Sequence, residues 1–130
     1  GGKYVAPQPM ENKFKESRFI EQIMVIGEYQ KHPAALVVPA FPFVKEWCAN
    51  KGIAVTSNEE IAANEQVKAR IKEEIDSCNQ QFGQWEQVKK FELIGREWSV
   101  ESGELTPTMK LKRKVIMAKY QHLVDKIYGA

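Results

Sequence analysis

The sequence has few of the residues that form disulfides or bind metals, and it has no long apolar run. Only two of its 130 residues are cysteine and two are histidine. Cys48 and Cys78 form no CxxC pair, so we expect free thiols in a reducing compartment rather than a disulfide framework or a zinc site. The sequence contains no stretch of about 18 apolar residues, the length that would indicate a membrane-spanning helix. We therefore expect a chain in the cytoplasm.

The whole chain also has little excess of positive over negative charge. The 19 Lys and Arg residues nearly balance the 17 Asp and Glu residues, giving a net charge of +2. This balance does not by itself indicate a nucleic-acid binder, and we expect no nucleic-acid partner. The local exception is 105–120, where five Lys or Arg residues occur without an acidic one. The length and the 43% hydrophobic content suit one domain spanning residues 1–130.

Hydrophobic periodicity predicts strands and helices along the chain. Apolar runs predict strands at 19–26 and 34–38, whose short link favours an antiparallel pair, and alternation predicts a third strand at 88–94. The unbroken run at 34–38 is typical of a central strand that is covered on both faces. The sequence therefore predicts an α+β fold with a three-stranded sheet flanked by helices.

Capping and turn residues place the predicted helices. The expected helices run from Pro9 to Ser17, from Pro42 toward Gly52, from a capping box at Ser57 through Phe82, and from Lys112 through Ile127. Residues 2–6 predict a loop and a short strand, part of an N-terminal β-hairpin. The lone His32 lies in the link between the first two strands, and we interpret it as a solvated turn residue.

The basic segment follows a proline turn, Thr106-Pro107-Thr108, and runs into the last predicted helix. Lys110 and the cluster 112–114 would place positive charge near a helix start, where an anion is favoured. Phosphate is the natural candidate, and a nucleic-acid backbone is the competing one. Because Tyr120 is the sole aromatic residue of this segment, the segment offers little surface on which the bases of a nucleic-acid strand could stack.

Two motifs carry a resemblance to a known family. The segment 103–113, GELTPTMKLKR, resembles the last signature motif of AMP-forming long-chain fatty-acid–CoA ligases, of the adenylate-forming acyl-CoA synthetase superfamily. The segment 2–11, GKYVAPQPME, resembles the motif that follows the interdomain hinge in the same family. The two motifs occur in the right order at opposite ends of the chain. The resemblance therefore covers essentially the whole sequence.

This resemblance implies a C-terminal lid domain whose large N-terminal partner domain is absent. That larger domain would bind ATP, Mg²⁺ and the fatty acid, so the fragment alone is expected to be inactive. The resemblance assigns the catalytic role in adenylation to Lys110, and it places Gly2 beside the pantetheine of coenzyme A after a domain rotation. Lys3 and Arg113 are candidates for binding coenzyme A or nucleotide. No resident metal site is expected in the chain itself.

Two other classes of function stay open. The first is a stand-alone α+β module that binds an anion or nucleic acid through the basic segment. The second is a relative that passes the acyl group to a carrier protein instead of coenzyme A. For the parent enzyme we also consider peripheral association with a membrane.

Overall fold

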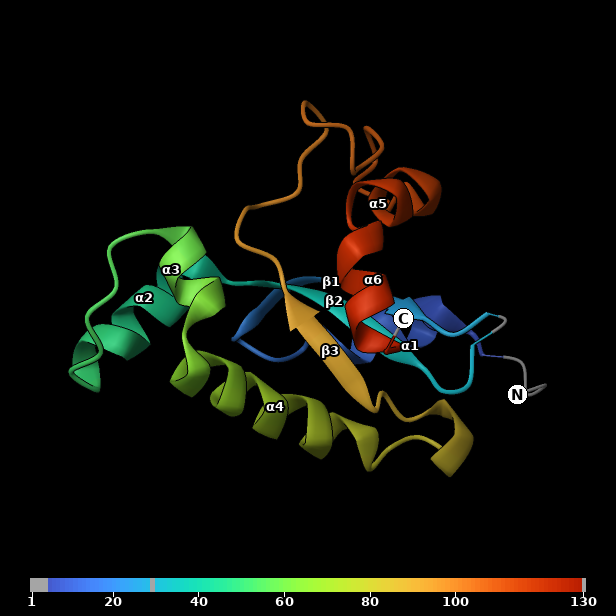
Figure 1. The fold of residues 1–130 in the computed structure, drawn as a ribbon, viewed down its shortest axis with the longest axis horizontal. Coiled ribbons are helices and arrows are strands. Elements are labelled where there is room, and N and C mark those ends of the chain that lie inside the picture. Colours follow the sequence, from blue (N-terminus) through green and yellow to red (C-terminus); the bar gives the residue numbers. More distant parts are fainter. Residues whose placement is uncertain (1–4, 29, 130) are drawn as a thin grey trace. The chain divides into compact units, whose positions relative to one another are not determined.

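The computed structural model describes residues 5–28 and 30–129 (Figure 1). The chain divides into two compact units, one up to Arg96 and one from Glu97 onward. The expectation that residues 1–130 act as one domain stays a prediction. No helix of the described ranges is long and apolar enough to cross a membrane.

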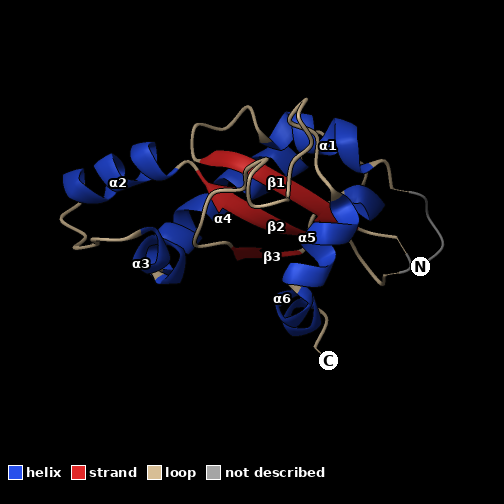
Figure 2. Ribbon diagram, turned by 90° about the horizontal axis from the view of Figure 1, so that it is seen from above, coloured by secondary structure: helices blue, strands red, loops and turns tan. Residues whose placement is uncertain are grey.

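The first unit is built on a three-stranded mixed sheet, drawn in red in Figure 2. Its strands are β1 (Ile20–Ile26), β2 (Ala34–Pro39) and β3 (Lys90–Leu93), in the order β1-β2-β3. β1 pairs antiparallel with β2, and β3 pairs parallel with β2. The predicted α+β fold, three-stranded sheet and antiparallel first pair are therefore confirmed.

β2 is the central strand that its apolar sequence predicts. Every residue of β2 is buried, and Ala34 through Val38 are 0% exposed. Neighbouring strands occupy both edges of β2, and a side chain on either face is shielded from water. Such complete burial explains why this strand needs no polar alternation.

Helix α1 (Pro7–Phe14) packs against the edge strand β1. It begins at Pro7 rather than at the predicted Pro9, because proline is tolerated throughout the first turn, where backbone N–H groups have no helical partner. The buried Glu11 side chain accepts a hydrogen bond of 2.7 Å from the Val25 N–H of β1. Residues 1–4 of the predicted N-terminal β-hairpin lie outside the described residues, while Val5 and Ala6 adopt no strand.

The segment between β2 and β3 carries three α-helices and one turn of 3₁₀-helix. They are α2 (Phe41–Asn50), α3 (Asn58–Ala63), α4 (Glu65–Asn79) and η1 (Gln84–Glu86). Both cysteines, Cys48 in α2 and Cys78 in α4, are free thiols. Cys48 is buried, whereas Cys78 is half-buried.

The single helix predicted from Ser57 through Phe82 is wrong, because the chain forms α3 and α4 with a break at Asn64. The Asn64 backbone is extended, and its side chain accepts hydrogen bonds from the N–H groups of Gln66 and Val67 at 2.9 and 3.0 Å. An asparagine that caps a helix in this way competes with continuation of the preceding helix. Phe82 lies beyond the end of α4.

The second unit contains α5 (Arg113–Lys119) and α6 (Gln121–Ile127), where the sequence predicted one helix. The break falls at Tyr120, whose φ of −116° and ψ of 24° leave the helical region. The Tyr120 ring lies against Trp98, with 6.2 Å between ring centroids, and its hydroxyl oxygen is 3.4 Å from the Trp98 Nε1 donor. A tertiary contact therefore coincides with the interruption that helical periodicity did not show.

A buried asparagine joins α4 to the start of β3. The Asn79 side chain donates to the Val88 carbonyl oxygen at 2.9 Å and accepts from the Val88 N–H at 3.0 Å. Both residues are buried, so the amide takes the place of a backbone partner that this segment lacks.

We predict that Asn79→Ala lowers the free energy of unfolding by about 2–3 kcal/mol, because it leaves two buried backbone groups of Val88 without their partner. Urea denaturation of the 130-residue chain measures the change. The matched control is Gln80→Ala, at the exposed next position. An equal loss in both variants would contradict the role of Asn79.

Candidate functional site

The basic segment forms a short hairpin, which we call the lysine hairpin and define as residues 104–112. Leu105 and Leu111 make an isolated antiparallel bridge. On one side of this bridge the Lys112 N–H donates to the Glu104 carbonyl oxygen at 2.7 Å, and on the other the Thr106 N–H donates to the Lys110 carbonyl oxygen at 2.8 Å. Lys110 is thus held by backbone hydrogen bonds near the hairpin tip.

The two threonines shape this tip. The Thr106 hydroxyl oxygen accepts a hydrogen bond of 3.0 Å from the Lys110 N–H, and it lies 3.1 Å from the Thr108 hydroxyl oxygen. Pro107 occupies a turn position for which its fixed φ is suited, and the Met109 N–H closes the turn on the Thr106 carbonyl oxygen at 2.7 Å. These hydrogen bonds fix the conformation of the hairpin tip.

Met109 stands out within the described part of the chain as the one non-glycine residue with positive φ, at 68°. Glycine usually takes such a position in a hairpin, and another residue costs about 1–2 kcal/mol there. The Met109 side chain is 57% exposed. This left-handed turn immediately precedes Lys110 and sets the direction in which the chain leaves the tip.

The structure describes two of the predicted site residues, Lys110 and Arg113, and leaves two outside the described ranges. Lys110 is exposed on the hairpin, and Arg113 is the half-buried first residue of α5. Both belong to one continuous segment of the second unit. Gly2 and Lys3 lie outside the described residues, so the structure does not test their predicted contacts with coenzyme A or nucleotide. Lys112 and Lys114 are exposed at the start of α5.

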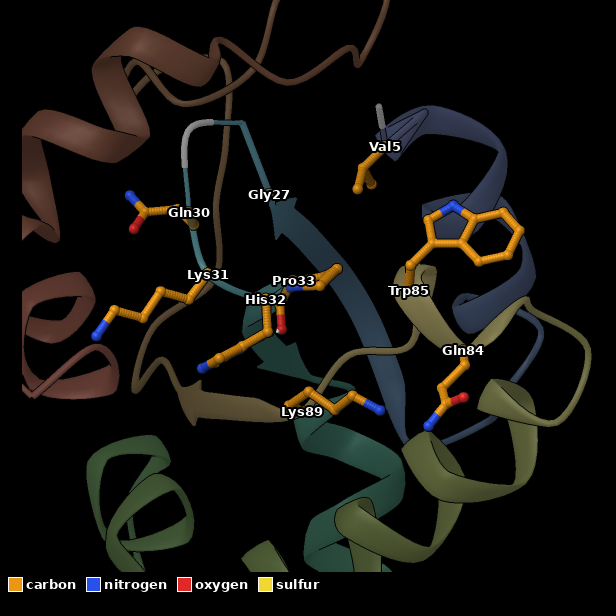
Figure 3. Close-up of a pocket in the computed structure, with 9 residues that line it drawn as sticks. All are labelled: Val5, Gly27, Gln30, Lys31, His32, Pro33, Gln84, Trp85 and Lys89. Carbon is orange, nitrogen blue, oxygen red and sulfur yellow. Dashed lines mark hydrogen bonds between the residues drawn. The ribbon is translucent and has the colours of Figure 1, made fainter. Parts of the chain in front are cut away.

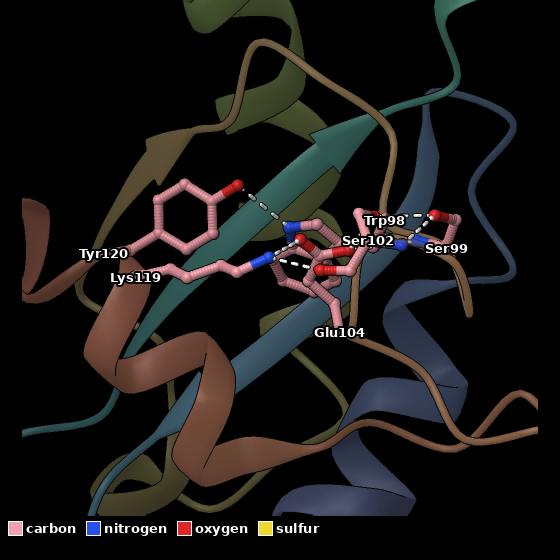
Figure 4. Close-up of polar contacts among 6 residues, drawn as sticks. All are labelled: Trp98, Ser99, Ser102, Glu104, Lys119 and Tyr120. Atoms are coloured by element: carbon pink, nitrogen blue, oxygen red, sulfur yellow. Dashed lines mark hydrogen bonds and ion pairs between the residues drawn. The ribbon is translucent and has the colours of Figure 1, made fainter.

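A buried carboxylate at the base of the hairpin was not singled out from the sequence. Glu104 is 2% exposed, and its side chain accepts hydrogen bonds from the Lys119 ammonium at 2.6 Å, the Ser102 hydroxyl at 2.5 Å and the Ser99 N–H at 3.1 Å (Figure 4). Lys119 also donates to the Ser102 carbonyl oxygen at 2.5 Å. The acidic residue directly before a basic segment was the one sequence signal for this network.

Burial of Glu104 acts to raise its pKa, but the surrounding donors outweigh it. The hydrogen bonds from Lys119, Ser102 and Ser99 and the charge of Lys119 lower the pKa of Glu104 to about 2. The carboxylate is therefore ionised at any ordinary pH, and it is paired with the Lys119 ammonium. A buried charge is stable only when it is paired and hydrogen-bonded in this way.

A second candidate feature, which we call the basic pocket, is a pocket of about 200 Å³ in the first unit, beside the link between β1 and β2 (Figure 3). Its described lining contains three basic side chains, Lys31, His32 and Lys89, and no carboxylate, and the 51% exposed Trp85 borders it. This combination suits an anionic ligand that also carries a planar group. His32, expected to be a solvated turn residue, is half-buried in the pocket wall.

The pocket was missed because its lining comes from three separate segments of the chain. Val5, the link at 27–33 and the segment 84–89 meet there. The Lys89 N–H donates to the Pro33 carbonyl oxygen at 3.0 Å, which ties two of these segments together. Gly27 faces Val5 so closely that an added Cβ would lie 3.1 Å from the Val5 side chain. Within the described residues, no group of three or more acidic, His or Cys side chains could hold a metal ion.

Comparison with known proteins identifies the family. The model of the AMP-binding enzyme C-terminal domain matches residues 1–130. Human long-chain-fatty-acid–CoA ligase 1 is 34% identical over 131 residues, covering 98% of this chain and 19% of that protein. The ligase FadD15 of Mycobacterium tuberculosis is 30% identical over 130 residues, covering 99% and 22%. The chain belongs to the family of C-terminal domains of AMP-binding enzymes.

Solved structures show the same fold. The adenylation and carrier didomain of carboxylic acid reductase from Segniliparus rugosus, in complex with AMP, matches with a TM-score of 0.76 at 21% identity, covering 98% of this chain and 16% of that one. The fatty acyl CoA synthetase of Mycobacterium tuberculosis matches with a TM-score of 0.56 at 18% identity. The chain spans about a fifth of the length of the curated relatives it matches. It is therefore similar to one part of longer enzymes.

The state of Glu104 predicts a pH-dependent stability. Its pKa in the folded chain is about 2, below the ordinary value of 4.5, so its contribution is fully present above pH 4.5 and is lost as the pH falls toward 2. We expect Glu104→Gln to lower the free energy of unfolding on the order of 3 kcal/mol near pH 7 and much less near pH 2. Denaturant titrations of the 130-residue chain at several pH values measure this gap.

The control for this titration is Glu101→Gln, an exposed glutamate of the same loop, whose substitution should change stability little at any pH. A gap between the wild-type chain and Glu104→Gln that stayed constant from pH 7 to pH 2 would contradict the assigned charge state.

Proposed function

We propose that this chain is the mobile C-terminal domain of an ATP-dependent long-chain acyl-CoA synthetase. The overall reaction would convert fatty acid, ATP and coenzyme A into acyl-CoA, AMP and diphosphate through an acyl-adenylate. The observation that carries the proposal is the ordered hairpin presenting Lys110, in a chain matched along 98% of its length by long-chain-fatty-acid–CoA ligases. The large domain that binds ATP and fatty acid would belong to the rest of the parent enzyme.

In the first half-reaction, a carboxylate oxygen of the fatty acid attacks the α-phosphorus of ATP and diphosphate leaves. This step brings negative groups together, so a fixed positive charge stabilises the transition state. The Lys110 ammonium is a compact donor of three hydrogen bonds on an exposed hairpin, and it can meet the carboxylate and the α-phosphate together. Mg²⁺ bound with ATP on the large domain would neutralise further phosphate charge.

In the second half-reaction, the coenzyme A thiolate attacks the acyl carbonyl of the adenylate, and AMP leaves. The proposal includes a rotation of this domain that withdraws Lys110 and brings the Gly2 segment to the pantetheine, where a residue without a side chain allows close approach. The basic pocket is lined by Val5, which follows Gly2 and Lys3 in the sequence. We assign to this pocket the phosphate-bearing end of coenzyme A.

Arg113 and Lys3 remain further candidates for contact with coenzyme A or nucleotide. Transfer to a carrier protein is the alternative second half-reaction, and assays of the full-length enzyme with both acceptors separate the two. A stand-alone polyanion-binding module would instead bind nucleic acid with a steep dependence on salt. We further propose that the isolated domain is inactive and that the parent enzyme is cytoplasmic, with peripheral membrane association.

Lys110 should be needed for the first half-reaction of the parent enzyme. We expect Lys110→Ala to lower the rate of acyl-adenylate formation by at least about a hundredfold, because one positioned charge is lost from the transition state. Conversion of presynthesised acyl-adenylate to thioester should persist. Diphosphate release and thioester formation are measured separately, with Lys45→Ala on the exposed face of α2 as the control. Equal loss of both half-reactions would refute the assignment of Lys110 to adenylation.

The basic pocket should matter for the second half-reaction. Replacing Lys31 and Lys89 together by alanine should raise the KM for coenzyme A about tenfold or more, since two charges near the phosphate groups are lost. The rate of adenylate formation should be unchanged, as it should be in the Lys45→Ala control. An unaltered KM for coenzyme A would remove the pocket from the proposed mechanism.

A further inference from the structure

The Glu104 network closes a ring that contains the whole lysine hairpin. Starting from Glu104, the chain runs through the hairpin to Lys112, enters α5, and reaches Lys119 at the end of that helix. The Lys119 ammonium then returns to the Glu104 carboxylate at 2.6 Å. The hairpin is thus tied to α5 at both ends of the ring, through the backbone at Lys112 and through an ion pair at Lys119.

The base of the hairpin depends on this tie because its own ladder is short. One bridge, between Leu105 and Leu111, and the flanking hydrogen bond from Lys112 to Glu104 join its two arms there. A two-stranded hairpin of this size is marginal in water without packing or a clamp. Glu104 supplies both the backbone acceptor for Lys112 and the side-chain acceptor for Lys119, so its position fixes both arms relative to α5.

The ion pair differs from an ordinary surface pair. The Glu104 side chain is 3% exposed, whereas the Lys119 side chain is 40% exposed. Exposed pairs contribute little to stability, but a carboxylate held by an ammonium, a hydroxyl and a backbone N–H has a defined geometry. Beside it, Trp98 and Tyr120 make a second contact between the same two segments (Figure 4).

We propose that Glu104 and Lys119 are positioning residues for Lys110, which they hold at a fixed orientation through the base of the lysine hairpin. This inference rests on the proposed function of Lys110 in adenylation. Neither residue touches substrate; they act through the hairpin, whose tip carries the ammonium. Misplacement of a reacting group by about 1 Å can lower a rate a hundredfold. Loss of the pair therefore affects the adenylation step and spares the thioester step.

The test in the full-length parent enzyme uses Lys119→Met, which removes the charge and keeps an unbranched side chain, and Lys119→Arg, which restores the charge. We expect Lys119→Met to lower kcat for adenylate formation about ten- to a hundredfold, with KM for ATP and the thioester half-reaction little changed. Lys119→Arg should recover most of the rate. Lys72→Met is the matched control, because it removes the exposed ion pair of Lys72 with Asp76 on α4.

A merely structural role would lower both half-reactions in the same proportion, as the folded fraction fell, and that result would overturn the proposal. An unchanged adenylation rate in Lys119→Met would overturn it as well. These outcomes are read beside Lys110→Ala. If Lys110→Ala leaves adenylation intact, the proposed function fails first, and the positioning role fails with it.

Amide hydrogen exchange on the 130-residue chain tests the tie independently of activity. In Lys119→Met the Thr106 and Lys112 amides, which donate across the hairpin, should exchange at least about tenfold faster, while the amides of β2 should not change. Unaltered protection at both hairpin amides would overturn the tie itself. Faster exchange there, in a parent enzyme that does not need Lys110, would leave the tie between the hairpin and α5 standing but overturn both the proposed function and the positioning role.

Discussion

The burial of β2 is the constraint on which the first unit depends. Its residues from Ala34 to Val38 are fully shielded, so both edges must be paired and both faces must be covered. The antiparallel partner β1 follows from a short link, whereas the parallel partner β3 requires a crossover, which α2, α3 and α4 provide. The link beside β2 carries Lys31 and His32, so a rigid strand pair supports the basic pocket.

The second unit is ordered in a different way. Its segment from Glu97 to Lys112 contains no β-strand apart from one isolated bridge. The buried Glu104 carboxylate organises the turns of this segment by accepting hydrogen bonds from three donors. Such a network is demanding, because each partner must be present for the buried charge to be stable. The network also fixes the conformation of a loop, as the hydrogen bonds of a sheet fix the conformation of its strands. A lysine on such a loop can be exposed and still be precise in position.

The sequence predicted what is encoded by continuous patterns. Apolar runs located the strands, and two motifs indicated the family that the comparisons show, while the role of Lys110 stays a prediction. Helical periodicity, however, runs through Asn64 and Tyr120, where a side-chain cap interrupts the first helix and an aromatic contact with Trp98 coincides with the second break. The pocket and the Glu104 network could not be predicted, because each joins residues that only the folded chain brings together. Glu104 alone reads as an ordinary polar turn residue.

The parallel pairing of β2 with β3 also determines the order in which the chain can complete its fold during synthesis. β1 and β2 can pair as soon as Pro39 has left the ribosome, but Ala34 pairs with Lys90, so one edge of an entirely apolar strand waits for the intervening helices. Non-local pairing of this kind is slow, and an unpaired apolar edge is prone to aggregation. The lysine hairpin emerges after β3, when the first unit already has all three strands of its sheet.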